Sequence, residues 1–315
     1  MTPFESNFFK YFVLKFNFFG LKKLIATSYA CSSAASTELP LFDCKSAGEK
    51  TTKVPYKIEI SEVVKNPEAG FDITAVTDLL CNKKNVLSRL KGNGDFRSPE
   101  CIELLKESDV VITNPPFSLF REYVAKLDEY KKKFLIVGNK NAITYKEIFK
   151  LIKENKMWVG NTPMGTDMLF DVPEHFAKTL VSTKQEGSGY KIVNGIVKGR
   201  AQAIWFTNLD LQKRHEKFTL YKKYSAKEFP KYDNYDAIEV SKVVEIPMDY
   251  DGIMGVPISF LDKYNPEQFE IVGSADDKDF YPIIFGKYEG RIMLKGREPF
   301  KRIFIRKTKS VPLGG

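Results

Sequence analysis

The apolar and polar positions of the first 160 residues alternate between helix-like and strand-like patterns. Ser6 is a suitable N-cap for an aromatic-rich helix over Asn7–Phe19, and Gly20 is a suitable end for it. The next apolar run, Lys22–Tyr29, is typical of a buried strand. Lys57–Ile60 alternates charged with apolar residues at strand period, which predicts an edge or exposed strand.

The same alternation continues toward residue 160. The pattern predicts, in order, a mostly helical Val76–Arg89, a helix over Pro99–Glu107, a strand over Asp109–Thr113, a helix over Ser118–Lys132, a strand over Phe134–Val137, a helix over Tyr145–Asn155 and a strand over Met157–Gly160. Strands that alternate with helices of this length favour an α/β fold with a mainly parallel, doubly wound sheet. Ligands of such sheets bind at the carboxyl ends of the strands.

The strand Asp109–Thr113 ends at a stiff tetrapeptide, Asn114-Pro115-Pro116-Phe117. Its apolar run predicts a strand buried on both faces, and the two prolines stop the strand because they have no N–H for a sheet ladder. The tip then offers an asparagine oxygen, a proline carbonyl and an aromatic ring. Two acceptors and a ring can hold a planar amine by its N–H groups and its face. The alternative is a plain Pro-Pro turn with the phenylalanine packed in the core.

A tip of this kind also has a chemical use. An exocyclic amine conjugated with its ring is a poor nucleophile. Two acceptors that draw its hydrogens out of the ring plane move the nitrogen toward sp3 geometry and expose its lone pair. This activation requires no cysteine, histidine or metal.

The tetrapeptide Asn114–Phe117 resembles motif IV of the amino methyltransferases, which transfer a methyl group from S-adenosylmethionine to N6 of adenine. The resemblance to the adenine-specific methyltransferases of the EcoRI type extends from about Pro3 to Lys307. It is carried by Ser118–Val124, Lys133–Asn139, Asn141–Phe149 and Trp205–Leu209. One four-residue motif is weakly specific, whereas this collinear series is strongly so.

A second pair of residues resembles a cofactor motif of the same family. Asp95 and Phe96 stand just before the predicted helix that Ser98 caps. The resemblance implies that the Asp95 carboxylate accepts from the amine of the cofactor's adenine while Phe96 covers the face of that ring. The alternative is that Asp95 only closes a glycine-rich turn.

The resemblance implies a Rossmann-like S-adenosylmethionine-dependent methyltransferase sheet with a smaller C-terminal DNA-recognition region. The family's acidic cofactor loop lies just upstream of a helix like the one after Ser6, and here only five residues precede Ser6. We therefore expect a core at residues 1–160 that lacks its first strand. Residues 161–315 are expected to hold the last core strand near 201–209 and the recognition region. Truncation of the chain and loss of part of the cofactor site both stay open.

The implied activity is site-specific N6-methylation of adenine in double-stranded DNA, in a restriction-modification or phage context. Asn114 and the Pro115 carbonyl would orient the amine, Pro116 would hold the loop, and Phe117 would stack on the flipped-out base. Two alternatives remain. One is a catalytically impaired DNA-binding remnant, and the other is a methyltransferase that acts on RNA adenine or on a protein glutamine.

Charge adds modest support for a polyanionic partner. Lys and Arg total 49 against 40 Asp and Glu, a formal charge of +9. After Asn161, and again over Lys213–Lys223, basic residues are interleaved with aromatic ones, a mixture that suits phosphates and unstacked bases. A solvated basic face is an equally common explanation. Residues 30–56, rich in Ser, Ala, Thr and Lys, are expected to form a surface insertion.

The remaining signals argue against other classes of protein. Four cysteines without CxxC pairing and only two histidines argue against a zinc or disulfide framework. The acidic runs Tyr232–Asp236 and Ile246–Gly252 lack the ligand spacing of a calcium loop, so no metal is expected. No apolar run is long enough to cross a membrane and no signal peptide is evident, so the default location is the cytoplasm. The oligomeric state is left open.

Overall fold

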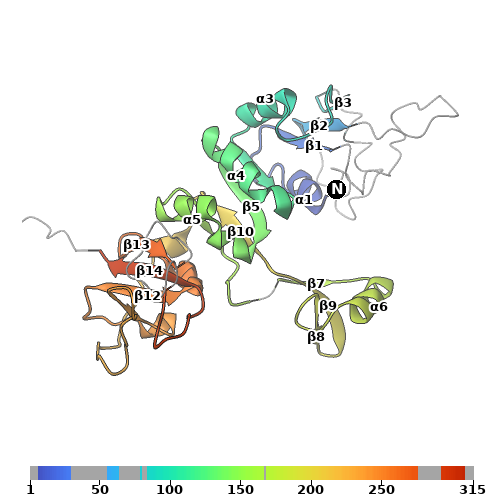
Figure 1. Ribbon diagram of the computed structural model, residues 1–315. Helices are drawn as coiled ribbons and strands as arrows, with labels where there is room; N and C mark the ends of the chain where they lie inside the picture. Colours follow the sequence, from blue (N-terminus) through green and yellow to red (C-terminus); the bar gives the residue numbers. More distant parts are fainter. Residues whose placement is uncertain are drawn as a thin grey trace, which may run out of the picture. The chain divides into compact units, whose positions relative to one another are not determined.

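The computed structural model describes residues 6–29, 55–63, 79, 84–166, 168–275 and 292–308 (Figure 1). The chain divides into two compact units, Met1–Ile112 and Thr113–Gly315. Most of the surface insertion expected at residues 30–56 lies outside the described residues. Within the described part, no helix is long and apolar enough to span a membrane.

The first unit contains a three-stranded antiparallel sheet. Its order is β1 (Leu24–Thr27), β2 (Tyr56–Ile60) and β3 (Val86–Arg89). The alternation predicted for β2 is confirmed, because Ile58 and Ile60 are fully buried. Its predicted edge or exposed position is wrong, since β2 pairs on both sides. A central strand tolerates the charge of Glu59 because Lys57 and Lys23 pair with it at 2.6 and 3.0 Å.

Helix α1 (Asn7–Leu14) begins where the sequence predicted. The Ser6 hydroxyl accepts a hydrogen bond from the backbone N–H of Phe9 at 3.4 Å, as an N-cap does. The helix ends at Leu14 rather than at residue 19, and turns lead from there to Gly20, which has a φ of 61°. Phe9 and Val13 pack in the core of the first unit with the apolar side chains of β2.

Helix α3 (Pro99–Glu107) has its predicted bounds. Ser98 caps it by accepting from the N–H of Cys101 at 3.3 Å, and Pro99 occupies its first turn. The helix predicted over Val76–Arg89 is wrong at its end, where Val86–Arg89 forms β3. The Leu87 side chain packs against the core of the unit from this strand, a tertiary contact that overrides local helix propensity.

A four-stranded sheet follows in the chain. Its order is β4 (Val110–Thr113), β5 (Lys133–Asn139), β10 (Ala203–Thr207) and β6 (Trp158–Val159). β10 runs antiparallel to both β5 and β6, which therefore run in the same direction. β10 lies within residues 201–209, where the last core strand was expected. β10 lies between β5 and β6 and runs in the opposite direction to both. These strand pairs therefore differ from the expected mainly parallel sheet.

Two amphipathic helices follow β4 and β5 in the chain. Helix α4 (Phe120–Glu129) buries Phe120, Val124 and Leu127, and α5 (Lys146–Lys153) buries Ile148, Phe149 and Ile152. These spacings place the apolar side chains on one stripe of each helix. Both helices lie beside β5 and β10 in Figure 1. They are shorter than predicted, and α4 is preceded by the 3-10 turn η2 (Phe117–Leu119).

The start of α4 is held against the sheet by two aromatic rings. The rings of Phe120 and Phe206 lie with centroids 5.2 Å apart, and both side chains are buried. A Cβ added at Gly138 would lie 2.5 Å from the Phe120 ring and 2.8 Å from the Phe206 ring. Glycine at this position therefore permits the close approach of helix and strand.

Gly138→Ala is expected to lower the free energy of unfolding by about 1–3 kcal/mol, the usual cost of overpacking a core. Chemical denaturation measures this change. Gly165→Ala is the matched control, because a Cβ there meets nothing within 4 Å. Equal stability of both variants and the wild type would contradict the packing argument.

Two further sheets lie in the second unit. The first is antiparallel with the order β7-β9-β8, formed by β7 (Met168–Asp171), β8 (Tyr190–Val193) and β9 (Ile196–Ala201), with helix α6 (Glu174–Thr183) between β7 and β8 in the chain. The second has the order β11 (Ala237–Glu239), β12 (Ile253–Pro257), β14 (Arg302–Lys307) and β13 (Phe269–Ser274). The strands predicted at residues 269–273 and 302–306 are confirmed, and they pair with each other.

Candidate active site

The tetrapeptide after β4 forms a fixed turn from strand to helix. Pro116 lies at the start of η2 with φ −56° and ψ 128°, and its carbonyl accepts from the N–H of Leu119 at 2.9 Å. The carbonyl of Phe117 accepts from the N–H of Phe120. Because Phe120 is buried against the sheet, the backbone just before it is held in place.

The Asn114 and Phe117 side chains of this turn are exposed. Asn114 is exposed and Pro115 is buried. Among the described residues, no hydrogen bond is made by the Asn114 side chain or accepted by the Pro115 carbonyl. The Phe117 side chain is 42 % exposed, whereas that of Phe120 is 1 % exposed. The alternative of a core Phe117 is therefore wrong, and two acceptors and a ring stand together at the turn.

The strand that leads into the turn is less buried than the sequence predicted. Val110 is 39 % exposed and Val111–Thr113 are partly buried. β4 stands at one end of the strand order, so no described strand of this sheet pairs with its outer side. The expectation of burial on both faces is wrong for the described part of the chain.

The segment Trp205–Leu209 has a structural role in the sheet. The Thr207 hydroxyl donates to the carbonyl of Phe134 at 2.6 Å in a buried position. The Asn208 side chain accepts from the N–H of Phe134 and donates to the carbonyl of Lys132, both at 2.8 Å. These bonds tie the end of β10 to the start of β5.

Asp95 and Phe96 belong to the first unit. The Asp95 carboxylate accepts from the backbone N–H of Arg97 at 2.8 Å, from its Nε at 2.9 Å and from its Nη2 at 2.8 Å. The Arg97 side chain lowers the pKa of Asp95, so this carboxylate is ionised at neutral pH. Its Oδ2 accepts a single one of these bonds and keeps acceptor capacity for a further donor. Phe96 is partly buried, and the Arg97 guanidinium lies 5.2 Å from the centre of its ring.

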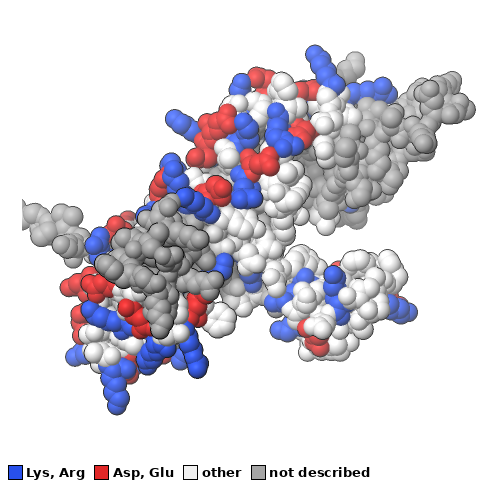
Figure 2. All heavy atoms as spheres, viewed as in Figure 1, with Lys and Arg blue, Asp and Glu red and all other residues white. Residues whose placement is uncertain are grey.

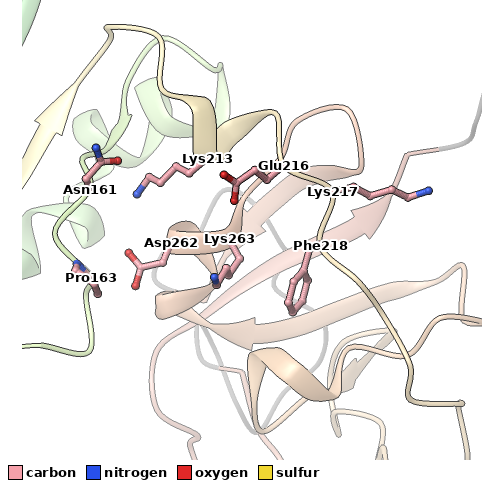
Figure 3. Close-up of a pocket in the computed structure, with 8 residues that line it drawn as sticks. All are labelled: Asn161, Pro163, Lys213, Glu216, Lys217, Phe218, Asp262 and Lys263. Atoms are coloured by element: carbon pink, nitrogen blue, oxygen red, sulfur yellow. The ribbon is translucent and has the colours of Figure 1, made fainter.

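The second unit also contains a pocket of about 310 Å³ that sequence reasoning did not find (Figure 3). Its lining comes from the loop after β6, the segment after β10 and the 3-10 helix η6 (Ile258–Lys263). The lining residues are Asn161, Pro163, Lys213, Glu216, Lys217, Phe218, Asp262 and Lys263. None of them belongs to the tetrapeptide. No sequence signal marks this pocket, because its residues are scattered and become neighbours only in the folded chain.

Charged groups in this pocket hold the loop after β6. Asp262 Oδ2 accepts from the N–H of Met164 at 2.8 Å, and the carbonyl of Met164 accepts from Lys140 Nζ at 2.8 Å. Lys213 Nζ donates to the carbonyl of Gly160 at 2.5 Å, and it points toward Asp262 in Figure 3. Burial raises the pKa of Asp262 and lowers the pKa of Lys213.

Asp262→Asn should stabilise the protein increasingly as the pH rises. A carboxyl whose folded pKa is raised costs stability once it ionises above its unfolded pKa, and the cost grows until the pH exceeds the folded pKa. The amide oxygen can still accept from Met164. Melting temperatures of both proteins between about pH 4 and pH 7 measure the effect.

The opposite sign is expected for Asp210→Asn, because a hydrogen bond with His215 lowers the pKa of Asp210. A difference between Asp262→Asn and the wild type that stays constant with pH would contradict the raised pKa of Asp262.

Among the described residues, no group of three His, Cys, Asp or Glu side chains is arranged to hold a metal ion.

Comparison with known proteins places these features in context. The family model described as "Adenine-specific methyltransferase EcoRI" matches residues 2–308. The Type II methyltransferase M.EcoRI of Escherichia coli is 41 % identical over 313 residues, which cover 98 % of this chain and 84 % of the relative. M.MpnI of Mycoplasma pneumoniae is 36 % identical over 321 residues, covering 98 % and 86 %. No solved structure matches the chain significantly.

Proposed function

Because the chain belongs to the EcoRI family of adenine-specific methyltransferases, we propose that it transfers a methyl group from S-adenosylmethionine to N6 of an adenine in double-stranded DNA. One observation carries the assignment of the site. The turn at Asn114–Phe117 presents two unused acceptors and an exposed ring at the end of a strand. The sequence relatives are named as Type II methyltransferases, which fits a restriction-modification setting.

In this proposal the turn holds the target base. The Asn114 side-chain oxygen and the Pro115 carbonyl accept the two N6 hydrogens, and Phe117 stacks on the ring. The adenine must leave the duplex first, because a stacked base cannot present its amine in line with a methyl donor. Pro116 keeps the two acceptors in register. Acceleration then comes mainly from orientation and proximity.

S-adenosylmethionine would supply a methyl group that its sulfonium already activates for transfer. Asp95 and Phe96 fit the adenine of this cofactor by their chemistry. The carboxylate is ionised and retains acceptor capacity, and the ring offers an apolar face. Arg97 holds the carboxylate in one orientation, which favours a single direction for the incoming amine.

The proposed architecture is a Rossmann-like core at residues 1–160 that takes β10 as its last strand. The parallel direction of β5 and β6, joined through α5, supports this assignment. β10 would then be an antiparallel addition to an otherwise parallel sheet, as many such sheets have. The rest of residues 161–315 would bind DNA and select its sequence.

Transfer of a labelled methyl group tests the reaction. The purified chain, labelled S-adenosylmethionine and genomic double-stranded DNA should give label in DNA at N6 of adenine. Equal labelling of RNA, or labelling of protein glutamine alone, would favour the other methyltransferase alternative. Binding of the DNA without any binding of S-adenosylmethionine in a calorimeter would favour a catalytically impaired DNA-binding protein.

A further inference from the structure

The β8–β9 hairpin ends in a ribbon of two strands. β8 pairs with β9 along its whole length, whereas β7 pairs with β9 only from Lys198 to Ala201. Residues 192–197 therefore extend past the end of β7, and we call them the distal ribbon (Figure 1). Among the described strands, none pairs with the distal ribbon from outside the hairpin.

The turn of this hairpin is stiff. Val193 and Ile196 are direct partners, so Asn194 and Gly195 form a loop of two residues. Both have positive φ, 51° and 76°. Two successive residues of this kind are typical of a type I′ turn, whose twist matches that of the flanking strands. The side chains of the distal ribbon are thus held in a fixed register.

Apolar side chains are exposed on both faces of the distal ribbon. Ile192 is 47 % exposed and Ile196 is 58 % exposed. Cross-strand partners share a face, so Ile192 lies with Val197 and Ile196 lies with Val193. Successive residues of a strand point to opposite faces, so Ile196 lies on the opposite side of the ribbon from its neighbour Val197 and therefore from Ile192. Exposed apolar side chains on a stiff projection indicate a surface that contacts a partner.

The base of the distal ribbon carries two lysines and the Glu186 carboxylate, whose Oε1 accepts from the N–H of Ile192 at 3.1 Å. Lys191 and Lys198 are direct cross-strand partners, an arrangement that destabilises a sheet because like charges face each other. Lys198 pairs with Asp171. Lys191 is exposed and forms no ion pair with a described residue. Figure 2 shows more Lys and Arg than Asp and Glu side chains on the surface formed by β7, β8, β9 and α6.

We propose that the distal ribbon enters the major groove of duplex DNA, with Lys191 on a flanking phosphate and the face that it shares with Val193 and Ile196 against base edges. The major groove admits a two-stranded β-ribbon, and apolar side chains there contact the methyl group of thymine. The unpaired lysine beside an apolar tip favours DNA over a second protein as the occupant. The inference deepens the proposed function by naming the segment that reads its substrate.

Lys191→Gln tests the phosphate contact. The probe is a mixed-sequence duplex about three helical turns long, followed by fluorescence anisotropy across about 50–200 mM salt. Loss of one phosphate contact should weaken binding by about tenfold at 0.1 M salt and reduce the slope of log K against log salt by about one. Circular dichroism confirms that the variant is folded.

Lys178→Gln is the matched control. Lys178 lies on α6, pairs with Glu174 at 2.9 Å and loses the same charge on substitution. Its affinity and salt slope should stay near those of the wild type. If Lys191→Gln behaves like Lys178→Gln, the proposal is overturned.

The double substitution Val193→Ser with Ile196→Ser tests the apolar contact. It should weaken binding while leaving the salt slope unchanged, because no charge is removed. Methyl green, which occupies the major groove, should displace the wild type from the duplex. Wild-type affinity in the double variant, or displacement only by a minor-groove ligand such as netropsin, would refute insertion into the major groove.

The experiments distinguish failure of the ribbon proposal from failure of the proposed methyl transfer. If the chain binds duplex DNA through Lys191 but transfers no methyl group, the result supports the role of the ribbon in DNA binding and refutes the proposed reaction. If the Lys191→Gln variant methylates DNA at subsaturating concentration as well as the wild type does, the result supports the proposed reaction and refutes the role of the ribbon.

Discussion

Asn114→Ala is expected to slow methyl transfer by a factor of about 10²–10³ while leaving binding of duplex DNA nearly unchanged. The substitution removes an acceptor that orients the amine, and an amine held by one acceptor keeps its lone pair in conjugation with the ring. Removal of one preorganised polar group from a reacting centre costs about 10²–10³ in kcat. Single-turnover transfer of labelled methyl to genomic DNA measures the loss.

The matched control for this prediction is Ser118→Ala. Ser118 is an exposed polar residue of the adjoining 3-10 turn, so its loss tests for a general disturbance of the turn. The stability of Asn114→Ala should match that of the wild type, because the side chain is exposed and forms no hydrogen bond with a described residue. Unchanged turnover of Asn114→Ala would refute its assignment to the site.

Phe117→Ala is expected to weaken retention of the flipped base by about 1–3 kcal/mol, the usual scale of a base stacked on an aromatic side chain. The effect should appear as a raised KM for DNA and a lowered kcat/KM. Because the Phe117 ring is 42 % exposed, the folded protein should lose little stability with it.

Two variants separate stacking from folding. Phe117→Trp keeps an aromatic face and should restore most of the activity. Phe120→Ala removes a ring that is 1 % exposed, and it should cost about 3–5 kcal/mol of unfolding free energy. Equal kinetics for Phe117→Ala and the wild type would show that the exposed ring does not stack on the substrate.

The elements that local physics controls were predicted well. Helix α3 has its predicted bounds because Ser98 and Pro99 are a strong start signal. The strands β5, β10, β13 and β14 were predicted from short apolar runs with β-branched and aromatic residues. The predictions were wrong where strand pairing decides the secondary structure, as in β3, which the sequence pattern assigned to a helix.

The candidate site divides in the same way. The turn at Asn114–Phe117 was predicted because proline restricts the backbone whatever surrounds it. The sequence could not predict that Phe117 is exposed and Phe120 is buried, because the two phenylalanines lie in the same short segment and residue type does not distinguish them. The contact of Phe120 with Gly138 and Phe206 selects which ring enters the core.

The sequence by itself determined the family, the tetrapeptide and the start signals of the helices, since these depend on residue types and on neighbours a few positions away. Only the tertiary structure decided the place of β10 between β5 and β6, the pocket beside Asp262 and the reach of the β8–β9 hairpin past β7. These features join residues far apart in the chain. Their energies depend on pairing and burial, which a linear pattern does not contain.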